Sequence, residues 1–599
     1  MKNPIYIVLP HQCFASNKYF MDRRLTQLSA AEEKRQKIVL VEEPYFFYHP
    51  QKRPYKIHKL KIAFHRACMQ YYKDYLEDKG FSNVTYIDYD TMLKAGDVIK
   101  ALEQANVLPS AQSTKEKEEE KSLKFVEPHD SEVKEAYTQA CASKKVRCEV
   151  LDDDIGFIMG HEELESFHKS NKNNKRIQHS SFFDKVKEKE DVLVNTASTD
   201  SDNQGALPAD FKEKFRTTNL TKDNQKYLDE AAKYVSNHKQ FKTHYGELDV
   251  ITEKNDNKNG DPVTVPFSLA ETAFCRDLDD LKEGTAKRTE AVSLPVTHND
   301  ARRHLRHFVR NRFEKFGDYQ DAVHSDYAIL YHSHLSFLLN AGLLTPHEVL
   351  REVMAQKGKV PINALEGFVR QLIGWREYMR YIYAYHEKEI KSENVFKLTR
   401  KIVDQKEWYD GTLGILPLDH EIRKIRRLGH AHHIIRLMFL LNFMVLCNVR
   451  QEDVVQWFME MVALDAYPWV MWSNIGAMGL YSDKFMRKPY ISTSNYIQRM
   501  SNYPEEIERP VKSKKNDKKN KNEESESDSE EEKEKKKNAL WTTIWDDLFY
   551  HFLSSKEALI KKHAAVYTRN LAFYNRKNAA EKRRLDENAE RFIRRVTRA

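Results

Sequence analysis

Residues 365–378 of the chain read Leu-Glu-Gly-Phe-Val-Arg-Gln-Leu-Ile-Gly-Trp-Arg-Glu-Tyr. Phe368, Leu372 and Trp375 recur at the spacing of one helix face, so the pattern predicts a helix packed against a core. A core helix with surface ion pairs explains the pattern without any functional role. The same periodicity, with few Gly or Pro residues, recurs in segments 304–316, 324–340, 345–356, 365–386, 418–448 and 451–464. From about residue 300 onward we therefore expect an all-α domain.

The first part of the chain has a different texture. Short apolar runs typical of buried strands occupy residues 5–10, 37–42, 83–89, 124–126 and 146–151. Helical patterns separate them, near residues 58–76 and 131–142. Strands that alternate with helices predict a parallel sheet. The expected fold class is an N-terminal α/β domain with a Rossmann-like parallel sheet, followed by a larger all-α C-terminal domain.

Polar stretches set the expected boundaries. We expect an α/β domain with a polar insertion over 1–155, a linker with insertions over 156–300, a helical domain over 301–504, a charged insertion over 505–538, and C-terminal helices with a basic tail over 539–599. The charged insertion consists of Lys, Glu, Asp, Ser and Asn blocks. Such a segment buries too little apolar surface to offset its ordering entropy, so we expect it to be disordered.

Composition narrows the class of protein. The 599 residues carry a net charge of +8 and contain 6 cysteines. No two of these cysteines form a CxxC pair, which argues against a disulfide framework or a thiolate metal site. No run approaches the ~20 apolar residues of a membrane span, and the N-terminal apolar run is too short for a signal peptide. We expect a monomer inside the cell, cytoplasmic or nuclear, with no membrane partner.

Two further motifs hold candidate functional residues. His430, His432 and His433 stand at i, i+2 and i+3, and three such side chains cannot face one side of a helix. This motif alone therefore predicts no metal site, although one or two of its histidines could transfer protons in a cleft. In segment 457–478, tryptophans surround a short polar set that includes Asp465, in what we expect to be a turn after a helix. These tryptophans either pack a core or flank a planar cofactor as a redox chain.

Together the segments 330–344, 366–378, 430–438, 465–470 and 488–501 resemble the photolyase/cryptochrome superfamily. Within it, the chain is similar to the branch that includes the prokaryotic (6-4) photolyases with an iron–sulfur cluster. The resemblance is strongest over residues 313–501 and weaker before residue 300. Several ordered motifs that agree are more specific than any one of them.

The resemblance implies a folded-back FAD in the helical domain. It assigns contacts with the phosphates, the pocket wall, the isoalloxazine edge and a nearby polar turn to Ser333, Leu335, Ser336, Gln371, Arg376, Arg436, Asp465 and Asn474. His334 stands where an Arg is usual in the family. Asp465 would accept a hydrogen bond from the flavin ring, and Arg436 would stabilise negative charge on a reduced flavin.

The resemblance also implies residues for the reaction. His432 and His433 match histidines of a lesion pocket, where His433 would donate a proton to a (6-4) photoproduct. Trp457 matches a member of the chain that photoreduces the flavin, and Tyr409 falls where a more distal Trp is common. Glu42 or Glu43 lies where an antenna pigment, typically a ribityllumazine, approaches the α/β domain.

The chain departs from the branch in its cysteines. The family's cluster needs four thiolates, yet the corresponding positions near Pro417 and in 503–507 have none, and Cys275 and Cys447 stand apart. Without soft ligands we expect no iron–sulfur cluster and no other metal. Basic residues that could form a DNA face are Arg302, Arg303, Arg306, Arg310, Arg312, Lys484, Arg487, Lys488 and Arg499.

The expected function is light-driven repair of UV-damaged DNA, with the (6-4) lesion favoured. Two alternatives stay open. One is a blue-light photoreceptor of cryptochrome type with the same flavin and no repair activity. The other is a nucleic-acid-binding protein that has lost its flavin.

Overall fold

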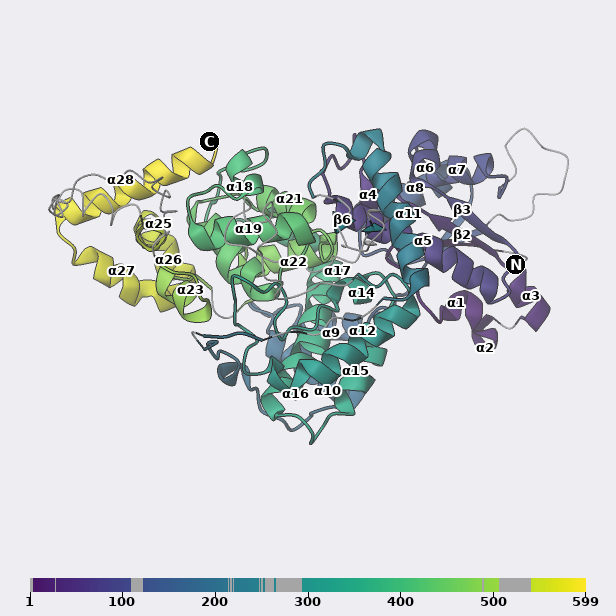
Figure 1. Cartoon of the computed structure of the whole chain (residues 1–599), viewed down its shortest axis with the longest axis horizontal. Coiled ribbons are helices and arrows are strands. Elements are labelled where there is room, and N and C mark those ends of the chain that lie inside the picture. The colour runs from purple at the N-terminus through teal and green to yellow at the C-terminus, as the bar shows by residue number, and fades with distance from the viewer. Residues whose placement is uncertain are drawn as a thin grey trace, which may run out of the picture.

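A computed structural model gives the arrangement of the chain (Figure 1). It describes residues 4–26, 28–108, 122–208, 210–213, 215, 218, 220–246, 248, 252–253, 263–264, 294–486, 490–505 and 540–599. The charged insertion that we expect to be disordered lies almost entirely outside the described residues, as do Cys275, Arg487 and Lys488.

A five-stranded parallel sheet forms the centre of the N-terminal domain. Its spatial order is β3-β2-β1-β4-β5. The strands are β1 (Ile5–Val8), β2 (Lys37–Val41), β3 (Val84–Ile87), β4 (Ser122–Val126) and β5 (Arg147–Leu151). The central strands are buried on both faces, which explains why they read as continuous apolar runs. Each predicted strand is confirmed, and so is the parallel sheet.

Helices cover this sheet and continue beyond it. They are α1 (Lys18–Met21), α2 (Arg23–Thr26), α3 (Ala30–Lys34), α4 (Pro44–Phe47), α5 (Lys59–Asp78), α6 (Tyr89–Ala95), α7 (Val98–Gln104), α8 (Ser131–Ser143), α9 (His161–Asn171), α10 (His179–Glu190) and α11 (Lys222–Asn237). α11 lies along α5 (Figure 1). Beyond the sheet, β6 (Thr252–Glu253) pairs antiparallel with β7 (Val263–Thr264).

The second domain is helical, as predicted. It comprises α12 (His298–Asn311), α13 (Phe313–Phe316), α14 (Ser336–Asn340), α15 (Pro346–Met354), α16 (Ile362–Val369), η3 (Arg370–Trp375), α17 (Arg376–Ser392), α18 (Lys406–Asp410), α19 (Leu416–Leu428), η4 (Ile435–Leu441), α20 (Asn442–Leu446), α21 (Gln451–Met461), α22 (Pro468–Met478) and α23 (Ser494–Met500). The long pairing of α17 with α22 organises its centre. None of the helices that the structure describes is long and apolar enough to cross a membrane.

The C-terminal helices pack on the far side of the helical domain from the sheet (Figure 1). They are α25 (Trp541–Ser555), α26 (Glu557–His563), α27 (Thr568–Asn575) and α28 (Ala579–Val596). Trp541, Trp545 and Phe592 enter the same hydrophobic core as Trp408 and Trp457. The last turn of α28 reaches back to α18, because the indole Nε1 of Trp408 donates to the carbonyl of Val596 over 2.8 Å.

Two predicted helices are wrong in extent. Segment 324–340 is helical only from Ser336, since Leu330 and His334 adopt left-handed backbone angles that end any helix. Segment 418–448 breaks at Gly429, whose φ of 58° closes α19. The histidines that follow lie on an irregular connection and the first turn of the next helix, so the helical spacing assumed for them does not apply.

Candidate functional site

A cavity of about 230 Å³ lies inside the helical domain. The structure brings to its wall every residue expected to hold FAD, namely Ser333, Leu335, Ser336, Gln371, Arg376, Arg436, Asp465 and Asn474. They come from α14 and the turn before it, η3, α17, η4, the loop before α22, and α22 itself. Asn474 lies within α22 and not in the expected turn, because its segment continues the helix that Pro468 begins.

Two of these elements are π-helices. η3 carries Gln371 and ends at Trp375, and η4 carries Arg436. A π-helix inserts an extra residue into a turn, which displaces side chains from the α-helical register, and such segments occur frequently at functional sites. Gln371 and Arg436 therefore reach the cavity from π-helical turns.

Asp465 is the acidic centre of the cavity. Its Oδ2 lies 2.5 Å from Nδ1 of His430 and 3.7 Å from Nη2 of Arg436, and its Oδ1 accepts a hydrogen bond from the Ser336 hydroxyl. Burial opposes ionisation of this carboxyl, but His430, Arg436 and Ser336 outweigh it and hold the pKa of Asp465 well below its usual value. Asp465 is thus a fixed negative charge beside a guanidinium.

Two guanidinium groups at the cavity have a buried N–H without a hydrogen-bond partner among the described residues. These are the Nε atoms of Arg376 and Arg436. Burial lowers the pKa of Arg376 to about 10, which still leaves it protonated at neutral pH. Buried N–H groups without partners are costly. Two such guanidinium donors at one cavity fit an anionic or carbonyl-bearing ligand, which matches the phosphate or ring-carbonyl groups of a flavin cofactor.

A larger cavity of about 630 Å³ adjoins the first, because Gln371, Trp375 and Asn474 line both. His433 lies in its wall and keeps 30% of its side chain exposed. Nε2 of His433 faces the carboxylate of Asp321 at 3.7 Å. A histidine that is accessible from this cavity and backed by a carboxylate is suited to proton transfer.

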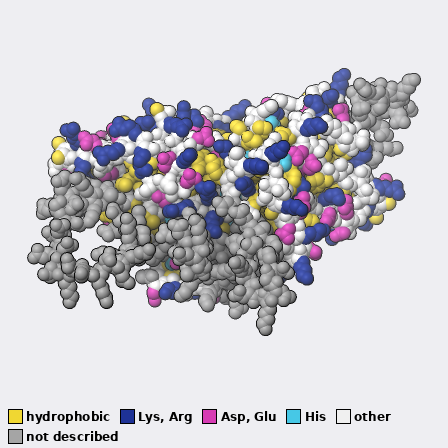
Figure 2. Space-filling view, turned by 45° about the horizontal axis from the view of Figure 1, so that its top comes forward, with side chains coloured by type: hydrophobic (Ala, Val, Ile, Leu, Met, Phe, Trp, Pro, Cys, Tyr) yellow, Lys and Arg dark blue, Asp and Glu magenta, His cyan; other side chains and the backbone are white. Residues whose placement is uncertain are grey.

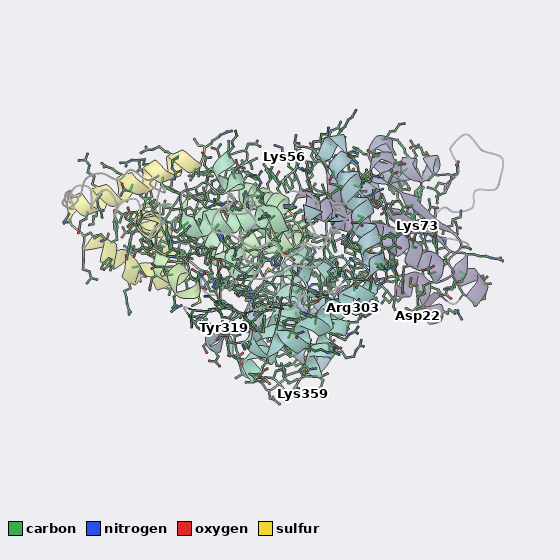
Figure 3. The ribbon with its side chains drawn as sticks, viewed as in Figure 1. Asp22, Lys56, Lys73, Arg303, Tyr319 and Lys359 are labelled. Atoms are coloured by element: carbon green, nitrogen blue, oxygen red, sulfur yellow. The ribbon has the colours of Figure 1, made fainter. Side chains whose placement is uncertain are left out.

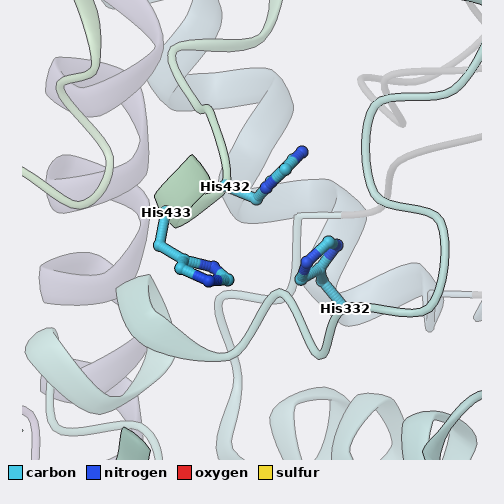
Figure 4. Close-up of side chains that lie close together, drawn as sticks. All are labelled: His332, His432 and His433. Carbon is cyan, nitrogen blue, oxygen red and sulfur yellow. The ribbon is translucent and has the colours of Figure 1, made fainter. Parts of the chain in front are cut away.

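His432 occupies a different environment from His433. Its ring stacks on His332 with centroids 4.2 Å apart and an angle of 17° between the planes, and His433 stands across this pair (Figure 4). Burial moves the pKa of His432 well below its usual value, so the ring is neutral. His432 therefore supports the wall and is not exposed to a substrate in the way that His433 is.

One nitrogen from each of these three histidines lies within 4.8 Å of the others, which is close enough to hold a metal ion. However, both ring nitrogens of His332 already face backbone carbonyls, those of Ile329 at 2.8 Å and Gln320 at 2.7 Å. Ligand lone pairs lie in the ring plane, and the rings of His332 and His432 are nearly parallel. The three nitrogens do not converge on one point in this arrangement.

Trp457 and Tyr409 line neither cavity. The indole Nε1 of Trp457 donates to the carbonyl of Trp408 over 2.9 Å. The Tyr409 hydroxyl donates to Oε2 of Glu460 over 2.8 Å, and its ring stacks on Tyr245. The two expected relay residues belong to the same hydrophobic core.

A third cavity, also about 230 Å³, lies at the carboxyl edge of the sheet. Glu43 lines it, whereas Glu42 is held by Arg66 at 3.0 Å and by Tyr86. Burial raises the pKa of Glu43 to about 7. Of the two glutamates that the sequence left open, Glu43 is the one that a ligand in this cavity would meet.

Several residues of the expected basic face are buried or form ion pairs within the protein. Arg312 is buried and donates to the carbonyl of Leu330 over 2.9 Å. Arg302 pairs with Glu348, and Lys484 with Glu389. Arg303, on α12 (Figure 3), pairs with Asp300. Arg306, Arg310 and Arg499 are exposed. On the face that Figure 2 shows, Lys and Arg side chains are interspersed with Asp and Glu.

The structure adds contacts that sequence reasoning did not assign. Asp321 and Trp375 line the larger cavity, His430 contacts Asp465, and His332 stacks on His432. His332 and His430 stand inside motifs that the sequence did highlight, so a closer look at those motifs could have found them. Asp321 lies outside every motif, and no signal in the sequence marks it.

Free thiols occur at Cys13, Cys68, Cys141, Cys148 and Cys447. Only Cys447, at the end of α20, belongs to the helical domain, and it is buried. Within the described part of the chain, no group of four thiols occurs. The expectation that the protein holds no iron–sulfur cluster stays a prediction.

Comparisons with known proteins point to the same superfamily as the motifs, but the family model matches the part of the chain before residue 300, where the motif resemblance is weaker. Residues 7–252 match the family model described as deoxyribodipyrimidine photo-lyase-related protein. A (6-4) photolyase of Agrobacterium fabrum is 38% identical over 220 residues, which are 36% of this chain and 43% of that protein. The alignment thus spans less than half of that relative. Two uncharacterized proteins of Acanthamoeba polyphaga mimivirus are 32% and 36% identical, over 80% and 98% of their own lengths and 22% and 21% of this chain.

One solved structure shares the architecture. The cryptochrome of Synechocystis sp. PCC6803 matches with a TM-score of 0.50 and 11% identity, covering 84% of this chain and 86% of that chain. A class III photolyase from Agrobacterium tumefaciens matches with a TM-score of 0.43 and 14% identity, covering 80% and 82%. The likeness to the Synechocystis cryptochrome concerns the fold alone, which is an α/β domain followed by a helical domain.

Proposed function

We propose that the chain belongs to the photolyase/cryptochrome superfamily and that it repairs UV-damaged DNA with light, acting on (6-4) photoproducts. One observation carries the proposal. The residues expected to hold FAD line one cavity, and that cavity shares a wall with a larger one that exposes His433. A cofactor site beside a substrate-sized cavity with a proton donor is the arrangement that such a reaction needs.

The cofactor would lie among Ser333, Gln371, Arg376, Arg436 and Asp465. When bound, reduced FAD supplies an electron on excitation by blue light. Arg436 places a positive charge beside this site, which favours an electron-rich ligand. Asp465 accepts an N–H of the ligand, and His430 with Ser336 holds its carboxylate in place.

The damaged dinucleotide would enter the larger cavity after it leaves the DNA stack. Unstacking costs only a few kcal/mol, and less for a base that is already poorly paired. His433 would donate a proton to the lesion and take it back, and Asp321 can pair with the ring while it is charged. His432 would hold the wall behind it.

Three further parts complete the proposal. Trp457 and Tyr409 would pass electrons that restore the reduced cofactor, from the hydrophobic core in which both lie. A ribityllumazine-type antenna would occupy the cavity beside Glu43. No iron–sulfur cluster would be present, and a monomer would bind damaged DNA.

Repair of defined lesions tests the proposal. The purified protein is loaded with FAD, which gives a flavin absorption spectrum, then reduced, and illuminated with duplexes that carry a (6-4) or a cyclobutane lesion. We expect restored bases from the (6-4) duplex. His433→Ala should lower the repair rate by about 100-fold or more, since it removes the proton donor. Flavin content should not change, because His433 does not line the smaller cavity.

His347→Ala, on the exposed surface of α15, is the matched control and should repair normally. Flavin binding without any repair would refute the enzyme and favour a photoreceptor. A protein that stays colourless after reconstitution would refute both and leave a flavin-less nucleic-acid-binding protein.

A further inference from the structure

A row of aromatic rings leaves the cavities along α17. Trp375, which lines both cavities, lies 6.2 Å from Tyr378 between ring centroids. Tyr378 stacks on Tyr381 with centroids 6.2 Å apart. Tyr381 in turn lies 5.5 Å from Tyr385, which is only half-buried. The four rings therefore connect the cavity wall to the surface with no gap.

The two inner tyrosines differ in what their hydroxyls contact. The Tyr378 hydroxyl lies 2.9 Å from the carbonyl of Ile177 and 3.0 Å from that of Phe485. A backbone carbonyl accepts a hydrogen bond but does not remove the proton. The Tyr381 hydroxyl lies 3.3 Å from Nε2 of His386 and 3.3 Å from Nδ1 of His168. An imidazole can take the proton.

His386 is built to be that acceptor. Its Nδ1 contacts Oε2 of Glu389 at 2.8 Å, which places the ring proton on Nδ1 and the lone pair on Nε2, toward Tyr381. Burial lowers the pKa of His386, so the ring is neutral and free to accept. The backbone of α17 is also distorted at this residue, where His386 has a non-helical φ of −132°. Lys484 fixes Glu389 from the other side at 2.7 Å.

We propose that Tyr381 is a redox-active tyrosine, which gives one electron to an oxidised Trp375 and its phenolic proton to Nε2 of His386. The ring of Tyr378 bridges the two. Trp375 is oxidised by a photo-excited flavin in the adjoining cavity, and in that respect the inference rests on the proposed function. The products are neutral Trp375, a neutral tyrosyl radical and an imidazolium paired with Glu389. A thiol reductant in the solvent returns one electron and one proton, through the exposed end of the row at Tyr385.

Loss of the electron without loss of the proton would leave a cationic phenol in a buried site, which is prohibitively costly. Of the two inner tyrosines of this row, Tyr381 has a base on its hydroxyl and Tyr378 has backbone carbonyls. Tyr378→Phe and Tyr381→Phe each remove a single oxygen from neighbouring buried rings, so they form a matched pair.

Electron paramagnetic resonance of the flavin-loaded full chain, frozen after illumination, tests the proposal. We expect a tyrosyl radical in the native protein and in Tyr378→Phe, and none in Tyr381→Phe. His386→Gln should slow radical formation by about 100-fold, since it removes the base, whereas His168→Gln should not. A radical that survives in Tyr381→Phe, or that depends on His168 and not on His386, overturns the inference.

A second experiment needs no flavin. A ruthenium photo-oxidant is attached to a Trp375→Cys variant in a Cys148→Ser, Cys275→Ser background, and the tyrosyl absorption band is followed after a flash. The tyrosyl band should appear in the variant that keeps Tyr381 and should be absent when Tyr381→Phe is added. Repair by chemically reduced protein is measured in parallel. Repair by Tyr381→Phe at the native rate with no radical in either experiment would refute the inference and leave the proposed function standing. A radical in the ruthenium experiment, from a protein that binds no flavin, would refute the proposed function. It would leave Tyr381 as a redox-active tyrosine.

Discussion

Glu43 shows how one buried carboxyl can govern stability. It lines the cavity at the edge of the sheet, and its Oε2 accepts a hydrogen bond of 2.9 Å from Tyr137. Burial raises its pKa from 4.5 to about 7. Between these two values the unfolded chain has lost a proton that the folded protein keeps. Stability is therefore lost as the pH rises from about 4.5 through about 7.

Glu43→Gln removes this titration and keeps an oxygen for Tyr137. We expect the variant to be more stable than the native protein by up to about 3 kcal/mol at pH 8, and by less than about 1 kcal/mol at pH 5. Urea unfolding at both pH values measures the difference. Glu162→Gln, on the exposed start of α9, is the control. A stability gain that is equal at both pH values would show that Glu43 is not the group that titrates.

At the scale of elements, the pairing of α17 with α22 supports both cavities. Gly476 allows this approach, because a Cβ built on it would lie 2.2 Å from Cγ1 of Ile390 and 2.8 Å from its Cδ1. α17 carries Arg376 and α22 carries Asn474. Separating the two helices would therefore change the cavity as well as the core.

Gly476→Ala should destabilise the protein by about 1–3 kcal/mol through overpacking, with a lower flavin content. Ile390→Ala alone should cost about 2–5 kcal/mol. The double variant should be more stable than the sum of the two by about 1 kcal/mol or more, since removing Cγ1 and Cδ1 makes room for the new methyl. Thermal unfolding of the four proteins gives this coupling. Strict additivity would mean that the helices are not in contact at Gly476.

The sequence predicted some elements better than others for physical reasons. The strands around Ile7 and Ile38 were predictable because buried parallel strands are short, apolar and separated by polar turns. The π-helical turns η3 and η4 were not, since one added residue barely alters the apolar spacing of a short segment. The left-handed backbone angles of Leu330 and His334 were not predictable either, because neither residue is a glycine.

The candidate site was only partly visible in the sequence. Periodicity placed Trp375 on a core helix but gave no reason to bring it beside Arg436 or Asp465. The motif resemblance supplied that set, and the structure gathers it at one cavity. Asp321 belongs to no motif and reaches His433 only through the fold. Contacts between distant segments of this kind depend on tertiary packing.

At the scale of the whole molecule, the two domains form one packed body. The backbone N–H of His58, at the start of α5, donates to the carbonyl of Glu460 over 2.9 Å, and its Nε2 contacts the carbonyl of Arg426 at 2.7 Å. The net charge of +8 is small for a chain of this length and is spread over both signs. The proposed binding to DNA would therefore depend on the positions of single cations, and not on total charge.

Arg499 is an exposed cation beside the larger cavity. Its guanidinium lies 5.7 Å from the ring of Tyr496, which lines the larger cavity, and it is exposed. We expect Arg499→Glu to weaken binding to lesion-containing DNA and to reduce the slope of log K against log salt by about 1, as the loss of one phosphate contact predicts. Lys359→Glu, on the exposed turn after α15 (Figure 3), changes the net charge equally and should leave the slope unchanged. Fluorescence anisotropy over a salt series measures both. If both substitutions reduce the salt slope equally, DNA binding depends on the total charge of the molecule. That result would contradict the proposal that the lesion enters the larger cavity.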